Sequence, residues 1–294
     1  MTQSIQTPQN TPSKNGSFKN WSPKNKFIVV GIIILAVIAG IYLWNQNQKS
    51  GLDELIIGIS PSFAKPLQVA VEEAKQQGVN VKLVEFSDWN TPNITLNHGD
   101  IDVNFFQHQP FLDNVKKETG FKLHGFAVGA ASHVGLYSKK YKSFEELPLN
   151  ASVVVPNDPV NQGRALLLLQ QAKLITLKDP ENHLSALKDI AENPKQFKFI
   201  EVEGPQTARA IDDADLAFGY PHYLRLAKTA DPESALLLDD NTNKRYAILF
   251  TVRDDFKDTD GKLQKFVDIY QNSPKVKAAL DQDFGATLWF PGWK

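Results

Sequence analysis

The sequence predicts an α/β protein of two lobes with a cleft between them, preceded by one transmembrane helix. Three observations predict this fold class. Short apolar strands alternate with helical segments from about residue 55 onward, which is typical of a mostly parallel sheet. A segment with the same alternation, 138–242, is inserted between two parts of the first lobe. Finally, residues 27–44 (FIVVGIIILAVIAGIYLW) carry no charged side chain and are long enough to cross a bilayer.

The apolar run 27–44 is interpreted as a retained membrane anchor. Four lysines precede it and only Lys49 follows closely, so the positive-inside rule keeps the N-terminus cytoplasmic and exports the rest of the chain. A cleaved signal peptide is the alternative, but the run exceeds the usual length of about 7 to 15 residues, and no small-residue cleavage site follows it. We therefore expect a disordered cytoplasmic tail (1–26), a transmembrane helix in the cytoplasmic (inner) membrane, a tether (45–52) and a periplasmic, extracytoplasmic body.

Composition excludes several classes of function. The chain is 42% hydrophobic, enough to build real cores. Residues 1–49 hold five lysines and no acid, which leaves 27 basic and 33 acidic side chains for the remainder. A mildly acidic body without basic runs does not favour nucleic acid as a partner. The absence of cysteine excludes disulfides, thiol catalysis and an acceptor for N-terminal lipidation.

No motif in the sequence indicates an enzyme. The chain lacks GxSxG, HExxH, a Walker loop and a dinucleotide fingerprint, and its six histidines show no metal-ligand spacing. We therefore expect no catalysis, no metal and no cofactor.

The body divides into an interrupted first lobe (53–137 and 243–294) and an inserted second lobe (138–242). In the first lobe, apolar runs at 55–60, 81–86 and 101–106 read as strands, and a helix is expected over 61–77. Two crossings between the lobes make a cleft, and clefts of this kind bind small molecules and close over them.

The motif VVVPNDPVNQGRALLLLQ (153–170) is the most informative stretch for function. It predicts a buried strand, a tight turn and a helix, because Asp158 can cap the helix and Pro159 suits its first position. The turn aims a helix N-terminus outward, and free N–H groups there favour an anion.

Asn157, Asn161 and Arg164 lie in this turn and in the first turns of its helix. An arginine fork offers two parallel hydrogen bonds to a carboxylate or phosphate, so these residues predict a site for a small acid. The alternative is that Arg164 forms an ordinary surface salt bridge.

Aromatic residues follow other strands of the body. The segment FFQHQPF (105–111) places phenylalanines and one histidine directly after a strand, and Trp89, Tyr220 and His222 occupy comparable strand tips. Such residues can enclose an apolar side chain, although each alone is equally consistent with core packing. Combined with Arg164, they predict a site for an amino acid with an apolar side chain.

At these residues the chain resembles the MetQ/NlpA family of methionine-binding proteins, which are receptors of ABC importers. The resemblance covers roughly residues 54–294. It rests on the long, ordered motifs GDIDVNFFQHQPFLDN, VGLYSKKYKS, VVVPNDPVNQGRALLLLQ and ENPKQFKFIEVEGPQTARAIDDADLAF.

The family resemblance implies a two-lobed periplasmic binding protein, type II-like, with methionine in the cleft. The family's ligand-binding positions fall on Trp89, Phe106, His108, Phe111, Asn161 and Arg164. The resemblance implies that Arg164 takes the ligand carboxylate and that His108 and the phenylalanines surround the thioether. Trp89 and Phe111 stand where family members often have tyrosine.

Two departures from the family concern the ligand's head group. His222 and Ile248 stand where the resemblance places asparagines, and losing such partners should cost about 1 to 3 kcal/mol each. Tyr220 and His222 are expected to form a substitute polar wall or to admit a larger ligand such as a short peptide. The missing lipid-bearing cysteine is a third departure, which the transmembrane helix compensates.

The sequence thus predicts an extracytoplasmic solute-binding protein that captures methionine, a related amino acid or a short peptide and delivers it to an ABC transporter permease. Asn157 and Asn161 are expected to orient the carboxylate or brace the turn. The alternative is a membrane-tethered envelope interaction or signalling module that has lost transport.

Overall fold

The computed structural model describes residues 54–239 and 244–294, and Glu54–Lys294 forms one compact unit. Among the described residues, no helix is long and apolar enough to cross a membrane. The predicted tail, transmembrane helix and tether (1–52) lie outside the described residues.

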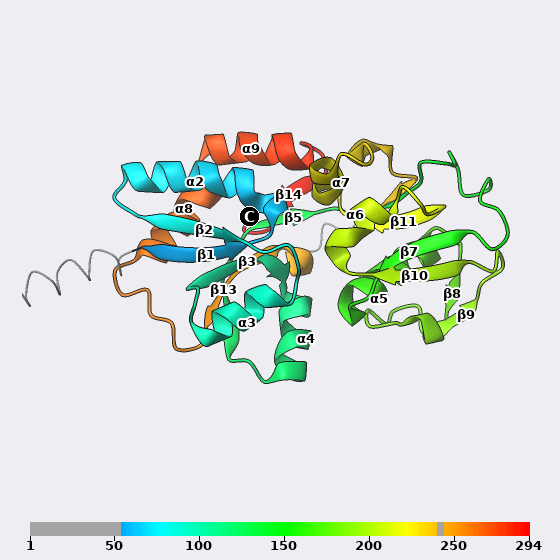
Figure 1. The fold of residues 1–294 in the computed structure, drawn as a ribbon, viewed down its shortest axis with the longest axis horizontal. Coiled ribbons are helices and arrows are strands. Elements are labelled where there is room, and N and C mark those ends of the chain that lie inside the picture. Colours follow the sequence, from blue (N-terminus) through cyan, green and yellow to red (C-terminus); the bar gives the residue numbers. More distant parts are fainter. Residues whose placement is uncertain (1–53, 240–243) are drawn as a thin grey trace, which may run out of the picture. The chain divides into compact units, whose positions relative to one another are not determined.

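The first lobe is built on a five-stranded sheet in the order β2-β1-β3-β13-β4 (Figure 1). Its strands are β1 (Leu55–Ile59), β2 (Val81–Glu85), β3 (Val103–His108), β4 (Leu123–Val128) and β13 (Ile248–Arg253). Strand β1 pairs in parallel with β2 and β3, whereas β13 runs antiparallel between β3 and β4. The parallel strands therefore end at one edge of the sheet, which faces the second lobe.

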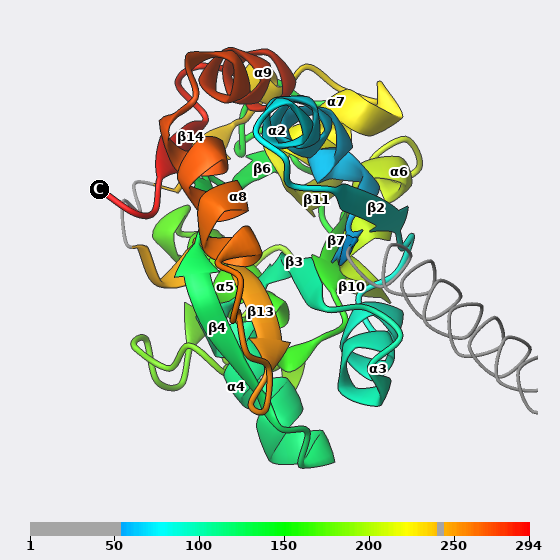
Figure 2. The same cartoon turned by 90° about the vertical axis from the view of Figure 1, so that its left-hand side faces the viewer.

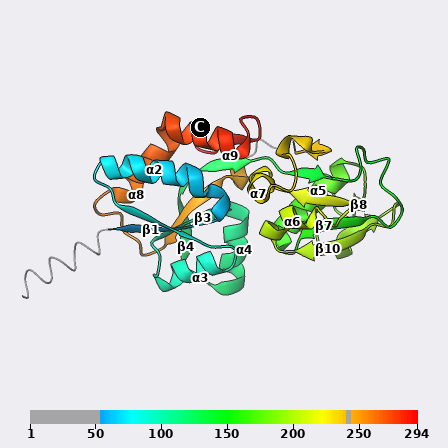
Figure 3. The same ribbon diagram turned by 45° about the horizontal axis from the view of Figure 1, so that its top comes forward.

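Helices cover both faces of this sheet (Figures 2 and 3). One face carries α2 (Ala64–Gln76), α8 (Lys262–Asn272) and α9 (Pro274–Phe284), and the other carries α3 (Thr91–His98) and α4 (Gln109–Thr119). Helix α2 buries Leu67, Ala70 and Ala74, whose spacing of three and four residues gives it one apolar stripe toward the sheet. This packing holds the strand ends in place.

The second lobe has a sheet of its own, in the order β10-β7-β11-β6-β12. Its strands are β6 (Gly135–Tyr137), β7 (Ser152–Pro156), β10 (Lys198–Val202), β11 (Leu216–Gly219) and β12 (Leu237–Leu238), and its helices are α5 (Pro159–Gln171), α6 (Thr207–Ala210) and α7 (Pro221–Ala227). Strand β7 lies between β10 and β11 and is parallel to both. The predicted strand, turn and helix of residues 153–170 are thus present as β7 and α5.

Shorter elements complete the described chain. Two small sheets pair β5 (Ala130–Ser132) with β14 (Trp289–Pro291) and β8 (Thr176–Leu177) with β9 (Ile190–Glu192). The 3-10 turns are η2 (Pro61–Phe63), η3 (Leu187–Asp189), η4 (Gly204–Gln206), η5 (Pro232–Ser234) and η6 (Lys244–Tyr246). The helix predicted over 61–77 is therefore divided into η2 and α2.

The first crossing between the lobes comes earlier than the sequence indicated. Residues 53–137 were assigned to the first lobe, but β6 (Gly135–Tyr137) is hydrogen-bonded between β11 and β12 of the second sheet. The chain therefore crosses between β5 and β6, and it returns between β12 and β13. His133 lies on the first crossing and Asp239 begins the second.

Candidate ligand-binding site

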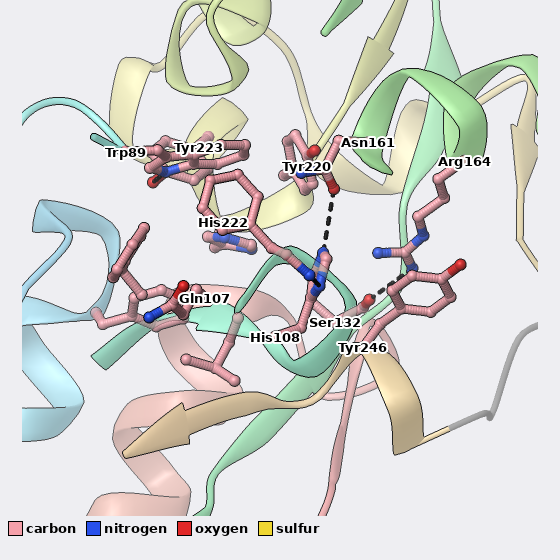
Figure 4. Close-up of a pocket in the computed structure, with 14 residues that line it drawn as sticks. Trp89, Gln107, His108, Ser132, Asn161, Arg164, Tyr220, His222, Tyr223 and Tyr246 are labelled. Atoms are coloured by element: carbon pink, nitrogen blue, oxygen red, sulfur yellow. Dashed lines mark hydrogen bonds between the residues drawn. The ribbon is translucent and has the colours of Figure 1, made fainter. Parts of the chain in front are cut away.

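A cavity of about 40 Å³ lies between the lobes, where parallel strands from both sheets end (Figure 4). It is lined by Phe63, Trp89, Phe106, Gln107, His108, Phe111, Ser132, Asn161, Arg164, Tyr220, His222, Tyr223, Tyr246 and Ile248. Figure 4 shows Arg164 and Tyr246 at one end of the cavity and Trp89 and Tyr223 at the other. Carboxyl ends of parallel strands are the usual place for ligands in α/β folds.

The structure brings nearly all of the predicted ligand-binding residues to this cavity. Those that line it are Trp89, Phe106, His108, Phe111, Asn161, Arg164, Tyr220 and His222. Asn157 does not: its side chain is exposed, and its backbone N–H donates to the Val202 carbonyl at 2.8 Å. Asn157 therefore braces the turn against β10, and only Asn161 reaches the cavity.

Arg164 is held in place by an acid that sequence reasoning did not single out. Its side chain is 9% exposed, and its Nη2 lies 2.7 Å from Asp239 Oδ2. The guanidinium stacks over the Tyr246 ring, with 4.2 Å from Cζ to the ring centroid. Arg164 Nε is buried and has no hydrogen-bond partner in the described protein. The arginine thus forms a buried ion pair rather than a surface one, and still has a donor to offer.

Asp239 joins this arginine to the first crossing. Its Oδ1 accepts from the Val134 N–H at 3.0 Å and lies 3.0 Å from His133 Nδ1. Burial opposes its ionisation, but the His133 hydrogen bond and the Arg164 charge outweigh that effect, so the pKa of Asp239 lies below its usual range. The hydrogen bond to Asp239 in turn raises the pKa of His133. Both crossings are therefore tied to the arginine of the cavity.

His108 links the two lobes through hydrogen bonds. Its Nδ1 accepts from the Phe111 N–H at 3.3 Å, which leaves Nε2 to donate to Asn161 Oδ1 at 3.2 Å. Burial, reinforced by the Arg164 charge, lowers the pKa of His108 to about 3. The imidazole is therefore neutral and carries its proton on Nε2.

The N-terminus of α5 is occupied by its own capping residue. Asp158 accepts from the Asn161 N–H at 2.9 Å, as the sequence predicted for a cap. Both carboxylate oxygens also accept from Asn161 Nδ2 at 3.1 Å. The expectation that these N–H groups await an external anion is therefore wrong, because the Asp158 carboxylate already satisfies the helix end.

Trp89 extends from the first lobe into the second. Its Nε1 donates to the Tyr223 hydroxyl at 2.9 Å, and its backbone N–H donates to Glu203 Oε1 at 3.3 Å. The Tyr223 hydroxyl also hydrogen-bonds Ser60 Oγ at the end of β1. These contacts, together with the His108 to Asn161 bond, hold the lobes closed over the cavity.

Tyr220 and His222 form a wall of the cavity that contains two unpaired polar atoms. The Tyr220 hydroxyl and His222 Nδ1 are buried and have no hydrogen-bond partner among the described residues. The His222 ring stacks against Phe63 and Phe284, at centroid distances of 5.2 and 4.7 Å. Burial, with a contribution from the Arg164 charge, lowers the pKa of His222 to about 3.

His222 should make the protein less stable in acid. Its folded pKa of about 3 lies below the unfolded value of 6.5, so the unfolded chain binds the extra proton as the pH falls below 6.5. We expect His222→Phe to reduce the loss of unfolding free energy between pH 7.5 and pH 5 by about 2 kcal/mol. Urea denaturation at the two pH values measures this. The exposed His98 provides the control: a change of the same size in His98→Phe would contradict the assignment.

Several cavity residues were not foreseen from the sequence. They are Phe63, Gln107, Ser132, Tyr223 and Tyr246. Phe63 and Tyr223 follow β1 and β11, so the rule that identified strand tips could have found them. Tyr246 and Ser132 lie on the crossings, where no local pattern indicates a ligand. Ile248, expected at a head-group position, does line the cavity.

The arrangement defines a class of protein. Two α/β lobes joined by two crossings enclose a small, mainly aromatic cavity with one arginine, and this is the two-lobed fold of periplasmic substrate-binding proteins.

Comparison with known proteins is consistent with this class. The family model described as NlpA lipoprotein matches residues 55–293. A D-methionine-binding lipoprotein MetQ from Salmonella typhi is 39% identical over 230 residues, covering 76% of this chain and 82% of that protein. A nutrient binding protein from Burkholderia cenocepacia, solved bound to methionine, is 38% identical with a TM-score of 0.74, covering 81% of this chain and 99% of that one. A solved methionine binding protein MetQ is 37% identical with a TM-score of 0.74, covering 82% and 99%.

The chain belongs to the NlpA lipoprotein family. The resemblance expected from the sequence motifs is therefore confirmed. The names of these relatives describe binding proteins and lipoproteins, and none of them supports the alternative of an envelope signalling module.

Proposed function

We propose that the protein captures methionine, a related amino acid or a short peptide in the interlobe cavity and delivers it to an ABC importer. The observation that carries the proposal is Arg164: its guanidinium is buried in a closed aromatic cavity, and its Nε has no hydrogen-bond partner in the part of the chain that the structure describes. A ligand carboxylate is the chemical group that best complements such a donor.

The opposite wall of the cavity suits an apolar side chain. Phe106 and Phe111 meet edge to face at 5.9 Å, and Trp89 meets Phe111 in the same way at 6.0 Å. His108 is neutral, so it closes this wall without adding a charge. A carboxylate at one end and an apolar group at the other describe an amino acid of the methionine type.

Ligand entry requires the lobes to separate. The cavity of about 40 Å³ is enclosed by hydrogen bonds that Trp89 and His108 make across the lobes. Breaking them opens the cleft, and reforming them encloses the ligand. Closure of this kind gives a transporter permease a loaded form to recognise.

We also propose that residues 27–44 anchor the protein in the cytoplasmic membrane, with the binding unit on the extracytoplasmic side. Support comes from the charge-free run and from the lysines that precede it. The relatives are named lipoproteins, but this chain contains no cysteine. A transmembrane helix would supply the anchoring that a lipid supplies elsewhere.

A ligand screen tests the proposed function. Thermal unfolding of the full chain is followed with amino acids, short peptides and matched carboxylic acids. A ligand at 100 times its dissociation constant should stabilise the folded state by about 2.7 kcal/mol, a readily measured shift. If no carboxylate-bearing compound raises the unfolding temperature, the proposal is contradicted.

A further inference from the structure

We propose that Asp158, the residue that caps α5, determines the ligand specificity of the cavity. Its carboxylate supplies the counter-charge for the ammonium of an amino acid, so the cavity prefers a zwitterion to an acid of the same shape that lacks the ammonium. The inference rests on the proposed function, because it takes Arg164 as the partner of the ligand carboxylate. It assigns a role in binding to a residue that does not itself line the cavity.

The charges around the cavity do not balance. Arg164 and Asp239 form an ion pair at 2.7 Å and neutralise each other. Asp158 has no cationic partner in the part of the chain that the structure describes, because its hydrogen bonds come from the backbone N–H and the Nδ2 of Asn161. The dipole of α5 offsets only about half a unit of its charge. A positively charged group of the ligand would complement the remainder.

Asp158 acts on the cavity across one intervening side chain. Asn161 is 2% exposed and lines the cavity, and its Nδ2 donates to both Asp158 oxygens at 3.1 Å. The carboxylate accepts all of these hydrogen bonds, as expected of its ionised form. Burial raises the pKa of Asp158, which shows that its charge is poorly solvated. Water therefore screens the charge of Asp158 from the cavity only weakly.

The negative charge reaches the wall of the cavity that faces the ligand's head group. The pKa of Tyr220 lies well above its ordinary value, first because of burial and then because of the Asp158 charge, which outweighs the opposite effect of Arg164 there. The phenol is therefore neutral, and its oxygen can accept a hydrogen bond from an ammonium. Burial lowers the pKa of His222 to about 3, so this neighbour adds no positive charge to the wall.

The two sides of the cavity differ in charge. The Arg164 guanidinium lies over the Tyr246 ring, and the Arg245 guanidinium lies 5.5 Å from the centroid of the same ring. The Tyr246 end is therefore positive, whereas the wall near Asp158 is negative. An amino acid matches this arrangement when its carboxylate meets Arg164 and its ammonium meets Tyr220.

Calorimetric titration of the full chain with matched ligands tests the inference. Methionine is compared with 2-hydroxy-4-(methylthio)butanoate, and leucine with 2-hydroxyisocaproate, because a hydroxyl replaces the ammonium at nearly the same size. Within the pair that binds more tightly, we expect the amino acid to bind about tenfold more tightly than the hydroxy acid. Equal or tighter binding of the hydroxy acid overturns the inference and leaves the proposed function standing. If none of the four compounds binds, the proposed function fails and this inference fails with it.

Asp158→Asn tests whether the preference comes from the carboxylate. Asparagine also caps helices well, so the variant removes the charge and keeps an acceptor for the Asn161 N–H. The ratio of the two affinities should fall about tenfold, because both ligands share the carboxylate and only the amino acid carries the ammonium. Asp158→Ser provides a second uncharged cap and should give the same ratio, so the test does not depend on the folding of a single variant.

Asp258→Asn is the matched control. Asp258 accepts from the Leu263 and Gln264 N–H groups in the first turn of α8, outside the cavity. Its replacement should leave the ratio of affinities unchanged, and a fall as large as in Asp158→Asn would overturn the inference. An unchanged ratio in both Asp158 variants also overturns it. Equal weakening of the amino acid and the hydroxy acid would then show that Asp158 acts only as a helix cap.

Discussion

Arg164→Ala is expected to weaken ligand binding by the full chain about a hundredfold or more. Arg164 is 8% exposed, and its Nε has no hydrogen-bond acceptor among the described residues. Truncating one partner of a buried charge pair costs about 2 to 5 kcal/mol, and the larger part of this range exceeds a hundredfold in affinity. Calorimetry with the best ligand of the screen measures the loss.

A second variant separates binding from folding. Arg164→Ala alone leaves Asp239 buried with only His133 and the Val134 N–H as partners, so it should also lower stability. Adding Asp239→Asn removes the stranded charge, and the double variant should recover stability without recovering ligand affinity. Arg209→Ala, on the exposed surface of α6, should leave affinity unchanged. Normal affinity in Arg164→Ala would refute the assignment of the carboxylate site.

The sequence predicted helices and strands correctly where they have a clear hydrophobic periodicity or a helix-capping residue. The segment 153–170 was predicted as strand, turn and helix because Asp158 and Pro159 are strong helix-start signals, and β7 and α5 are found there. The strand Gly135–Tyr137 was assigned to the wrong lobe. Its three residues are apolar in either sheet, so only pairing with distant strands decides where it belongs.

The strand-tip rule found most of the cavity, but it could not find the partners of the cavity residues. Arg164 was identified from the turn that presents it. Its acid, Asp239, is 75 residues away in the sequence and follows a two-residue strand. No local pattern connects two such positions, because their meeting depends on how both crossings fold. The prediction of an external anion at the N-terminus of α5 was wrong for a local reason. The Asp158 carboxylate already accepts a hydrogen bond from the N–H there.

The roles of Trp89 and Tyr220 show a further limit of sequence reasoning. Both were predicted to line a pocket, and both do. The sequence could not show that Trp89 also bonds across the lobes, because Tyr223 is 134 residues away. It could not show that the Tyr220 hydroxyl has no hydrogen-bond partner among the described residues, since that depends on every side chain packed around it.

Gly204→Ala is expected to prevent closure of the lobes and to weaken ligand binding about tenfold to a hundredfold. A Cβ at Gly204 would lie 2.0 Å from Trp89 Cζ3 and 2.2 Å from Cη2. The indole cannot move aside without breaking the hydrogen bond from its Nε1 to the Tyr223 hydroxyl. Overpacking of this kind costs about 1 to 3 kcal/mol, and the cost falls on the closed form alone because Trp89 and Gly204 belong to different lobes.

Small-angle scattering and calorimetry together test this expectation. The wild-type chain should contract when ligand is added, and Gly204→Ala should contract less. Gly120→Ala is the control, because Gly120 has a φ of 74° and open space around it, so alanine there strains the backbone without touching the other lobe. Trp89→Ala removes the obstructing ring, so adding Gly204→Ala to it should cause no further loss of affinity. If the two substitutions instead act additively, the steric clash between Gly204 and Trp89 is not what opposes closure.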